Sequence, residues 1–192
     1  MKRIVISTLL TMSGAGFALA DCPADFAQVL QSFKTAGPYH VTMDQSANGK
    51  TRKMEVDVIL PSSFHMKSPE MEAVMLSNGE WMKIKGKWMA MPAMMSKMTT
   101  NAISQGFASG MKGMKNLQCL GPQPIDGANL TSFAFDSSGQ AMGIKASSHV
   151  VMYVDANQKP SVMVIDGTAM GMKSKTVQHI TYDPSIQISA PQ

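Results

Sequence analysis

The stretch "TRKMEVDVILP", residues 51–61, decides the fold class of this chain. Its apolar residues fall on every second position, and charged residues such as Glu55 and Asp57 stand between them. A period of two places all the apolar side chains on one face of an extended backbone, so the stretch predicts a half-buried β-strand with one wet face. The apolar members are Met54, Val56, Val58 and Leu60.

The segments around this strand predict an antiparallel meander. "SFHMK" continues the alternation with Phe64 and Met66. Asn48-Gly49 and Asn78-Gly79 are hairpin signals, and Lys85-Gly86 indicates another tight turn. Short strands joined by tight turns pair with their chain neighbours. Later strands are expected at 130–137, 147–155, 160–167 and 174–183, with a loop at 155–159.

Two segments have helical rather than strand spacing. In "PADFAQVLQSFK", residues 23–34, Phe26, Val29, Leu30 and Phe33 form one helical stripe, and Gly37-Pro38 ends it. After Pro92, a second stripe predicts a central helix or two short helical pieces. It comprises Met94, Met98, Ile103, Phe107, Met111 and Met114. The predicted fold class is therefore α+β. It is a curved antiparallel sheet, an incomplete β-barrel, with an N-terminal helix and a central helical segment covering the concave face.

The first twenty residues are typical of a secretory signal peptide. Lys2 and Arg3 precede an apolar run, and Ala18-Leu19-Ala20 is the small-residue pattern that signal peptidase cleaves. We expect cleavage after Ala20, a periplasmic location, and one domain over residues 21–192. No later apolar run is long enough to span a membrane. The formal net charge is +4, and without Lys2 and Arg3 it is 15 − 13 = +2. Such a nearly balanced charge argues against a nucleic-acid-binding face.

The two cysteines, Cys22 and Cys119, predict a disulfide, because exported proteins normally oxidise such a pair. The bond would join the mature N-terminus to the middle of the chain. The alternative is that "LADC", residues 19–22, is a lipobox with Cys22 lipidated, although Asp21 stands where a small residue is preferred.

No catalytic signature is present. The sequence has no nucleophile elbow, P-loop, HExxH or CxxC motif, and His40, His65, His149 and His179 lack the spacing of metal ligands on a helix. The acidic residues form no evident acid–base pair. We therefore expect a protein that is not an enzyme and has no cofactor.

Methionine is the unusual component, with 20 residues in 192. One interpretation is a Cu(I) site, because thioethers are soft ligands. Its candidates are Met89, Met91, Met94, Met95 and Met98. The other interpretation is an apolar surface that adapts to its ligand, since methionine is flexible and polarizable. Most methionines fall where the strand or helix period requires an apolar residue, which favours this second interpretation.

The order of the elements resembles the periplasmic lipoprotein-carrier superfamily, the Lol-type half-barrels. Pro61 and Phe64 in "ILPSSFHMK" match its strand-Pro-x-x-Phe turn. Other matching positions are Asn78, Gly79, Trp81, Trp88 and Pro92 in the hairpin region, Asp155 and Pro160 in the late hairpin, and the closing "YDPSIQISAP". Leu60 stands where the carriers place a basic residue before the proline, so the chain resembles a divergent relative rather than the carrier itself.

The resemblance implies a periplasmic protein that holds a lipid-like or other apolar small molecule in a half-barrel with a helical lid. Envelope proteins are possible further partners, and a structural envelope domain without a ligand is the remaining alternative. The candidate cavity residues are Met54, Val56, Val58, Leu60, Phe64, Met66, Trp88, Met94, Met98 and Phe107.

Overall fold

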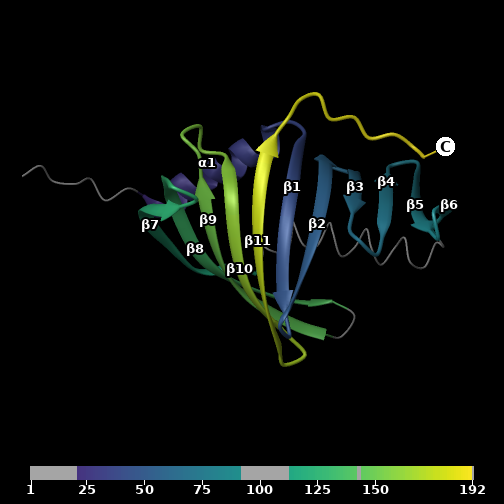
Figure 1. Ribbon diagram of the computed structural model, residues 1–192. Helices are drawn as coiled ribbons and strands as arrows, with labels where there is room; N and C mark the ends of the chain where they lie inside the picture. Colours follow the sequence, from purple (N-terminus) through teal and green to yellow (C-terminus); the bar gives the residue numbers. More distant parts are fainter. Residues whose placement is uncertain (1–20, 92–112, 142–143, 192) are drawn as a thin grey trace, which may run out of the picture.

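A computed structural model describes residues 21–91, 113–141 and 144–191 (Figure 1). It contains one helix and eleven strands in these ranges. They are α1 (Cys22–Thr35), β1 (Tyr39–Ala47), β2 (Lys50–Ile59), β3 (Ser63–Lys67), β4 (Glu72–Leu76), β5 (Gly79–Ile84), β6 (Lys87–Ala90), β7 (Lys115–Ile125), β8 (Ala128–Ala141), β9 (Ile144–Val154), β10 (Pro160–Ala169) and β11 (Met172–Tyr182).

All the strands form one antiparallel sheet in the order β6-β5-β4-β3-β2-β1-β11-β10-β9-β8-β7. Every neighbouring pair is consecutive in the chain except β1 and β11, which join the two meanders at the centre of the sheet. The strands β6 and β7 lie at the two edges, so the sheet is curved but not closed (Figure 1). The prediction of an incomplete antiparallel barrel with an N-terminal helix is confirmed.

Helix α1 packs on the concave face of the sheet through the predicted stripe. Phe26 and Val29 are buried, and Leu30 is half-buried against the same cluster. The Phe26 ring lies 5.3 Å from the Phe133 ring and 5.5 Å from the Phe135 ring, both in β8. Figure 1 shows α1 crossing behind the upper part of the strands β7 to β11.

The predicted central helix is not supported by the structure. Most of its stripe, from Met94 to Met111, lies outside the described residues. Met114, its last member, is described, and it is not helical but directly precedes β7. The helical cover of the described sheet is therefore α1.

Two of the three predicted tight turns have the expected geometry. Asn48 and Gly49, and likewise Lys85 and Gly86, have positive φ, as a twisted two-residue hairpin requires. The Asn78-Gly79 prediction was displaced by one residue, because Gly79 already pairs with Leu76 in the ladder. A Cβ atom at Gly79 would come within 2.6 Å of the Trp81 ring, so this glycine leaves room for an indole rather than forming a turn.

The sequence analysis did not predict β7. Its segment contains Gly121, Pro122 and Pro124, which disfavour an internal strand. The strand tolerates them because it lies at the edge of the sheet and has two register shifts against β8. The Asp126-Gly127 turn that follows, with positive φ at both residues, was the available hairpin signal.

The predicted disulfide between Cys22 and Cys119 is confirmed, with Cα atoms 5.6 Å apart. Cys22 is the first residue of α1, and Cys119 lies in β7 opposite Phe133. The bond therefore holds the start of the helix to the β7 edge, while the end of the helix continues directly into β1.

The core consists of two apolar clusters on the concave face. The first lies under α1 and joins its buried residues to β8 and β9; it comprises Phe26, Val29, Phe133, Phe135, Val150, Met152 and Val154. The second lies on β1 to β4 and β11; it comprises Tyr39, Val41, Val56, Val58, Phe64, Met75 and Ile180. Half-buried Met163 packs against both. The helix covers mainly the first cluster.

Candidate ligand-binding face

Methionines form a row across the middle of the concave face. The register places Met152 of β9 opposite Met163 of β10, and Met43 of β1 opposite Met54 of β2. Gln178 of β11 stands between the two pairs, opposite both Met163 and Met43. Directly opposed side chains on one face lie about 5 Å apart at their Cβ atoms, so the four methionines and Gln178 form one continuous row.

This methionine row contains one polar group. Gln178 Nε2 donates a hydrogen bond to the Met43 sulfur at 3.4 Å. Met152 is buried, whereas Met163, Met43 and Met54 are half-buried and retain accessible surface. The row therefore offers thioether surface for a ligand, with the amide held against one sulfur.

Six of the ten predicted cavity residues gather in the second cluster. Val56, Val58 and Phe64 are buried members, and Met54, Leu60 and Met66 are half-buried and pack against them. Their shared face follows from the period of two in residues 54–66. Whether they bind a ligand is not tested by this geometry, so that role stays a prediction.

The remaining four predicted residues do not join them in the described structure. Trp88 lies opposite Lys83 in the ladder, and Lys83 Nζ sits 5.4 Å from the centroid of its ring. The register places Trp88 and Lys83 on the convex face, away from the cluster. Met94, Met98 and Phe107 lie outside the described residues.

The Cu(I) candidates are described only in part. Met89 is 52% exposed in β6. The Met91 amide donates to the Glu80 carbonyl oxygen at 2.8 Å, which extends the β5–β6 ladder. Met94, Met95 and Met98 lie outside the described residues, so the copper hypothesis stays a prediction.

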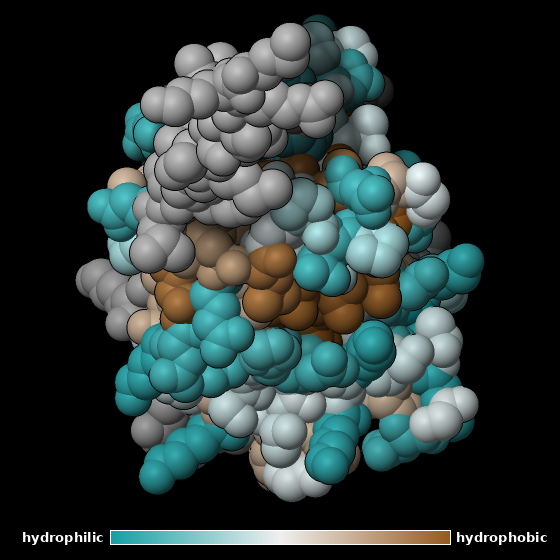
Figure 2. Space-filling view, turned by 90° about the vertical axis from the view of Figure 1, so that its left-hand side faces the viewer, coloured by the Kyte–Doolittle hydropathy of each residue, from teal (hydrophilic) through white to brown (hydrophobic). Residues whose placement is uncertain are grey.

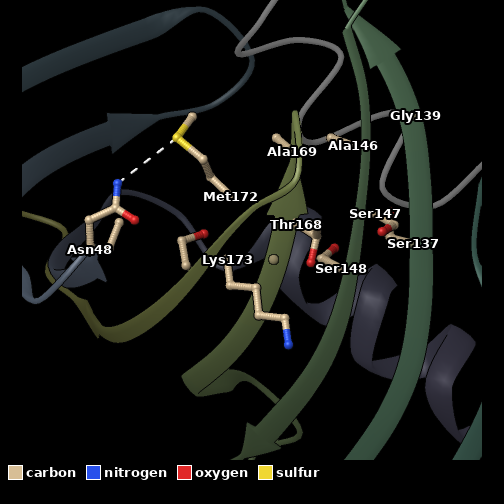
Figure 3. Close-up of a pocket in the computed structure, with 13 residues that line it drawn as sticks. Asn48, Ser137, Gly139, Ala146, Ser147, Ser148, Thr168, Ala169, Met172 and Lys173 are labelled. Atoms are coloured by element: carbon tan, nitrogen blue, oxygen red, sulfur yellow. Dashed lines mark hydrogen bonds between the residues drawn. The ribbon is translucent and has the colours of Figure 1, made fainter.

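A hollow of about 450 Å³ lies at the far end of the same sheet (Figure 3). Small and hydroxyl side chains dominate its lining, among them Ala47, Ser137, Ser148, Gly167, Thr168 and Ser174. Asn48 Nδ2 contacts the Met172 sulfur at 3.9 Å on one side of it, and Lys173 also borders it (Figure 3). The inner surface of the sheet thus changes from apolar at the helix end to polar and small at the other.

Hydrophobic residues also reach the surface of the molecule. Figure 2 shows them as a band across the side that carries the β7 edge, with hydrophilic residues below it. In β7, Leu120 is 39% exposed and Leu117 is half-buried against the first cluster. Apolar side chains of β7 therefore reach the surface of the described structure at this edge.

Tyr39 is the polar exception inside the second cluster. Its side chain is completely buried, and within the described part of the chain its hydroxyl has no hydrogen-bond partner. Burial raises the pKa of Tyr39 well above its ordinary value, so the group is a neutral phenol. A buried hydroxyl without a partner costs roughly 1–3 kcal/mol relative to a satisfied one.

The convex face carries charge instead. His40 Nδ1 lies 2.7 Å from Asp57 Oδ1, and the other Asp57 oxygen lies 3.8 Å from His65. His65 Nε2 lies 3.1 Å from Glu72, and Lys83 Nζ donates to Glu72 at 2.8 Å. These side chains form a partly exposed ladder across β1 to β5. Within it, His40 and His65 have carboxylate partners.

We predict that Glu72 contributes to stability in a pH-dependent way. Hydrogen bonds from Lys83 and then from His65 lower the pKa of Glu72 below its ordinary value of 4.5. Because the folded-state pKa is the lower one, the contribution is present above the unfolded-state pKa and is lost as pH falls through the folded-state value. Glu72→Gln should remove up to about 1 kcal/mol of unfolding free energy at pH 7, since the pair is partly exposed.

The measurement is urea unfolding of both proteins between pH 7 and pH 3. The stability difference should shrink toward the acid end. Glu70→Gln is the matched control, because the Glu70 side chain is 69% exposed and lies 3.6 Å from an equally exposed Arg52. An equal loss for both variants at every pH would contradict the assignment.

In residues 21–91, 113–141 and 144–191, no three His, Cys, Asp or Glu side chains are grouped as a metal site would need. In the same ranges no helix has the length and hydropathy to cross a membrane.

Comparison with known proteins gives structural relatives. No family model and no curated protein matches the sequence. The crystal structure of the Mycobacterium tuberculosis lipoprotein LppX matches with a TM-score of 0.60 and 15% identity, over 88% of this chain and 98% of that one. A putative outer membrane lipoprotein-sorting protein domain from Vibrio parahaemolyticus matches with a TM-score of 0.41 and 8% identity, over 85% of this chain and 93% of that one. MucB in complex with MucA(peri) matches with a TM-score of 0.43 and 13% identity, over 90% of this chain and 59% of that one.

The likeness to LppX spans nearly the whole of both chains, and at 15% identity it concerns the fold. The sequence resemblance predicted such a relationship from turn and hairpin positions. The chain therefore shares the fold of LppX.

Proposed function

We propose that this protein is a periplasmic binding or carrier protein for a hydrophobic or amphiphilic, lipid-like ligand. The observation that carries the proposal is the methionine row, which leaves half-buried apolar surface on the concave face of an unclosed sheet. Methionine suits such a surface because its unbranched side chain adapts to ligands of different shape. The LppX-like fold and the leader-like first twenty residues support the same role.

The binding energy would come from burying hydrocarbon. Each methylene group moved from water to an apolar surface contributes about 0.8 kcal/mol, so an acyl chain needs only a shallow apolar face to bind. The small, hydroxyl-lined hollow beyond the row gives the same face a polar end, which an amphiphile requires and a plain filled core does not.

We predict that Met43→Lys weakens the binding of a hydrocarbon probe. A lysine in the middle of the row places a charge on the surface that the probe must cover, so affinity for 1,6-diphenylhexatriene should fall at least about tenfold. Fluorescence titration of delipidated protein measures this affinity directly.

Native mass spectrometry of protein purified from the periplasm would identify the natural ligand.

The matched control is Thr42→Lys, which places the same charge on the next residue of β1 but on its exposed, convex side. That variant should bind the probe like the parent protein. Failure of the parent protein to take up the probe would refute the proposal and favour a structural domain with a filled core.

A further inference from the structure

If the concave face holds an acyl ligand, the hydroxyl of Tyr39, which has no partner among the described residues, is available to donate a hydrogen bond to it. The described chain offers a direct comparison, because Tyr182, the neighbouring tyrosine in the same cluster, donates its hydroxyl to the Pro160 carbonyl oxygen at 2.8 Å. The two rings lie 5.9 Å apart. One phenol of the pair is therefore satisfied within the protein, and the other is a buried donor with no acceptor in residues 21–91, 113–141 and 144–191.

The surroundings of Tyr39 select the kind of acceptor. Its strand neighbours are Val58 and Tyr182, and the Phe33 ring of α1 lies 5.2 Å from its own. The cluster around it is built of apolar and aromatic side chains. The ammonium group of Lys159 lies 4.9 Å from the centroid of the Tyr182 ring, on which it already packs. An ionised carboxylate among the apolar side chains of the cluster would lose its hydration, whereas a neutral carbonyl oxygen loses far less.

We propose that the Tyr39 hydroxyl donates a hydrogen bond to the ester carbonyl oxygen of an acyl-chain ligand. The hydrocarbon part then lies along β1, against Val41 and Met43 of the same face. This inference rests on the proposed function, and it adds the chemical class of the ligand, a neutral acyl ester, and the residue that orients it.

The carbonyl reaches the hydroxyl from the concave side. Phe33, Leu60 and Tyr182 pack against the cluster and are only partly buried. Phe33 belongs to the last turn of α1, where the helix is joined to β1 by the short segment 36–38. Because Tyr182 is held by its hydrogen bond to the Pro160 carbonyl oxygen, the rearrangement that the proposal requires is a movement of Phe33 or Leu60.

The test compares two probes on three proteins. Methyl parinarate carries an acyl chain and an ester, and 1,6-diphenylhexatriene carries no polar atom. Both are titrated by fluorescence against the parent protein, Tyr39→Phe and Tyr153→Phe. Tyr153 is the matched control, because it is the remaining tyrosine and follows Met152 in β9, on the opposite face of the sheet.

We expect Tyr39→Phe to bind methyl parinarate about five- to tenfold more weakly than the parent, the effect of one hydrogen bond. Diphenylhexatriene should bind both proteins equally, and Tyr153→Phe should match the parent with both probes. Tyr39→Phe should also unfold at the same or a higher urea concentration, since the hydroxyl it removes has no partner among the described residues.

The other outcomes separate the two hypotheses. If both probes bind the parent and Tyr39→Phe equally well, the ester contact is refuted and the carrier function stands. If both probes lose affinity equally in Tyr39→Phe, the residue acts through packing, and the contact is again refuted. If neither probe binds the parent, the proposed function itself fails. Unfolding of Tyr39→Phe would show that the hydroxyl has an internal partner, which overturns the premise.

Discussion

Replacing both cysteines, Cys22→Ser with Cys119→Ser, should lower the free energy of unfolding by about 3–5 kcal/mol. The disulfide closes a loop with a sequence separation of 97 residues. A cross-link of that span restricts the unfolded chain by roughly 4–5 kcal/mol on the chain-entropy model. The native state also loses the bond that holds the start of α1 to β7. Urea denaturation of the oxidised parent and the double variant measures the difference.

Reduction of the parent protein provides an independent control. The parent in the presence of a reductant should unfold at the same urea concentration as the double variant, and the variant should be unaffected by the reductant. A loss of less than about 1 kcal/mol would contradict the expectation and would imply that the unfolded chain is already restricted in this loop.

Phe26→Ala should cost about 3–5 kcal/mol of unfolding free energy, the usual range for deleting a buried phenylalanine. Phe26 is 2% exposed, and its ring packs against the rings of Phe133 and Phe135. The sheet beneath has fixed strand positions, so it has little freedom to fill the space. The measurement is again urea unfolding, with near-ultraviolet circular dichroism to follow the aromatic packing.

Gln28→Ala is the matched control on the same helix, because Gln28 is exposed and its removal should change stability by no more than about 0.5 kcal/mol. Similar small losses for both variants would mean that α1 is not packed on the sheet in solution. In that case the first cluster, and not only the methionine row, would be open to a ligand.

The local pattern of the chain predicted much of the fold, because period and turn chemistry act over a few residues. The alternation from Met54 to Met66 placed β2 and β3, and the stripe of Phe26 and Val29 placed α1. Asn48-Gly49 and Lys85-Gly86 placed two hairpins, since those residues accept the positive φ that the turn needs. The disulfide followed from an export signal and a cysteine pair.

The local sequence pattern gave wrong predictions where a residue's role depends on its position in the sheet. The segment of β7 contains two prolines, which a central strand excludes and an edge strand accepts, and no local signal shows which position a strand will take. Gly79 was interpreted as a turn residue, yet its role is to accommodate the Trp81 ring. Trp88 was a cavity candidate on its apolar character, but the ladder assigns it to the face of Lys83.

The sequence by itself determined the strand and helix periods, the hairpin meanders, the disulfide pair and the shared face of the residues from Met54 to Met66. Only the tertiary structure decided that the two meanders join through β1 and β11. That pairing brings Met43 opposite Gln178, although the two residues are far apart in the chain. It also buries Tyr39 beside Tyr182, where no other described residue offers its hydroxyl an acceptor. Periodicity determines which side of its own strand a residue occupies, whereas its neighbours across a sheet depend on which distant strands pair and in what register.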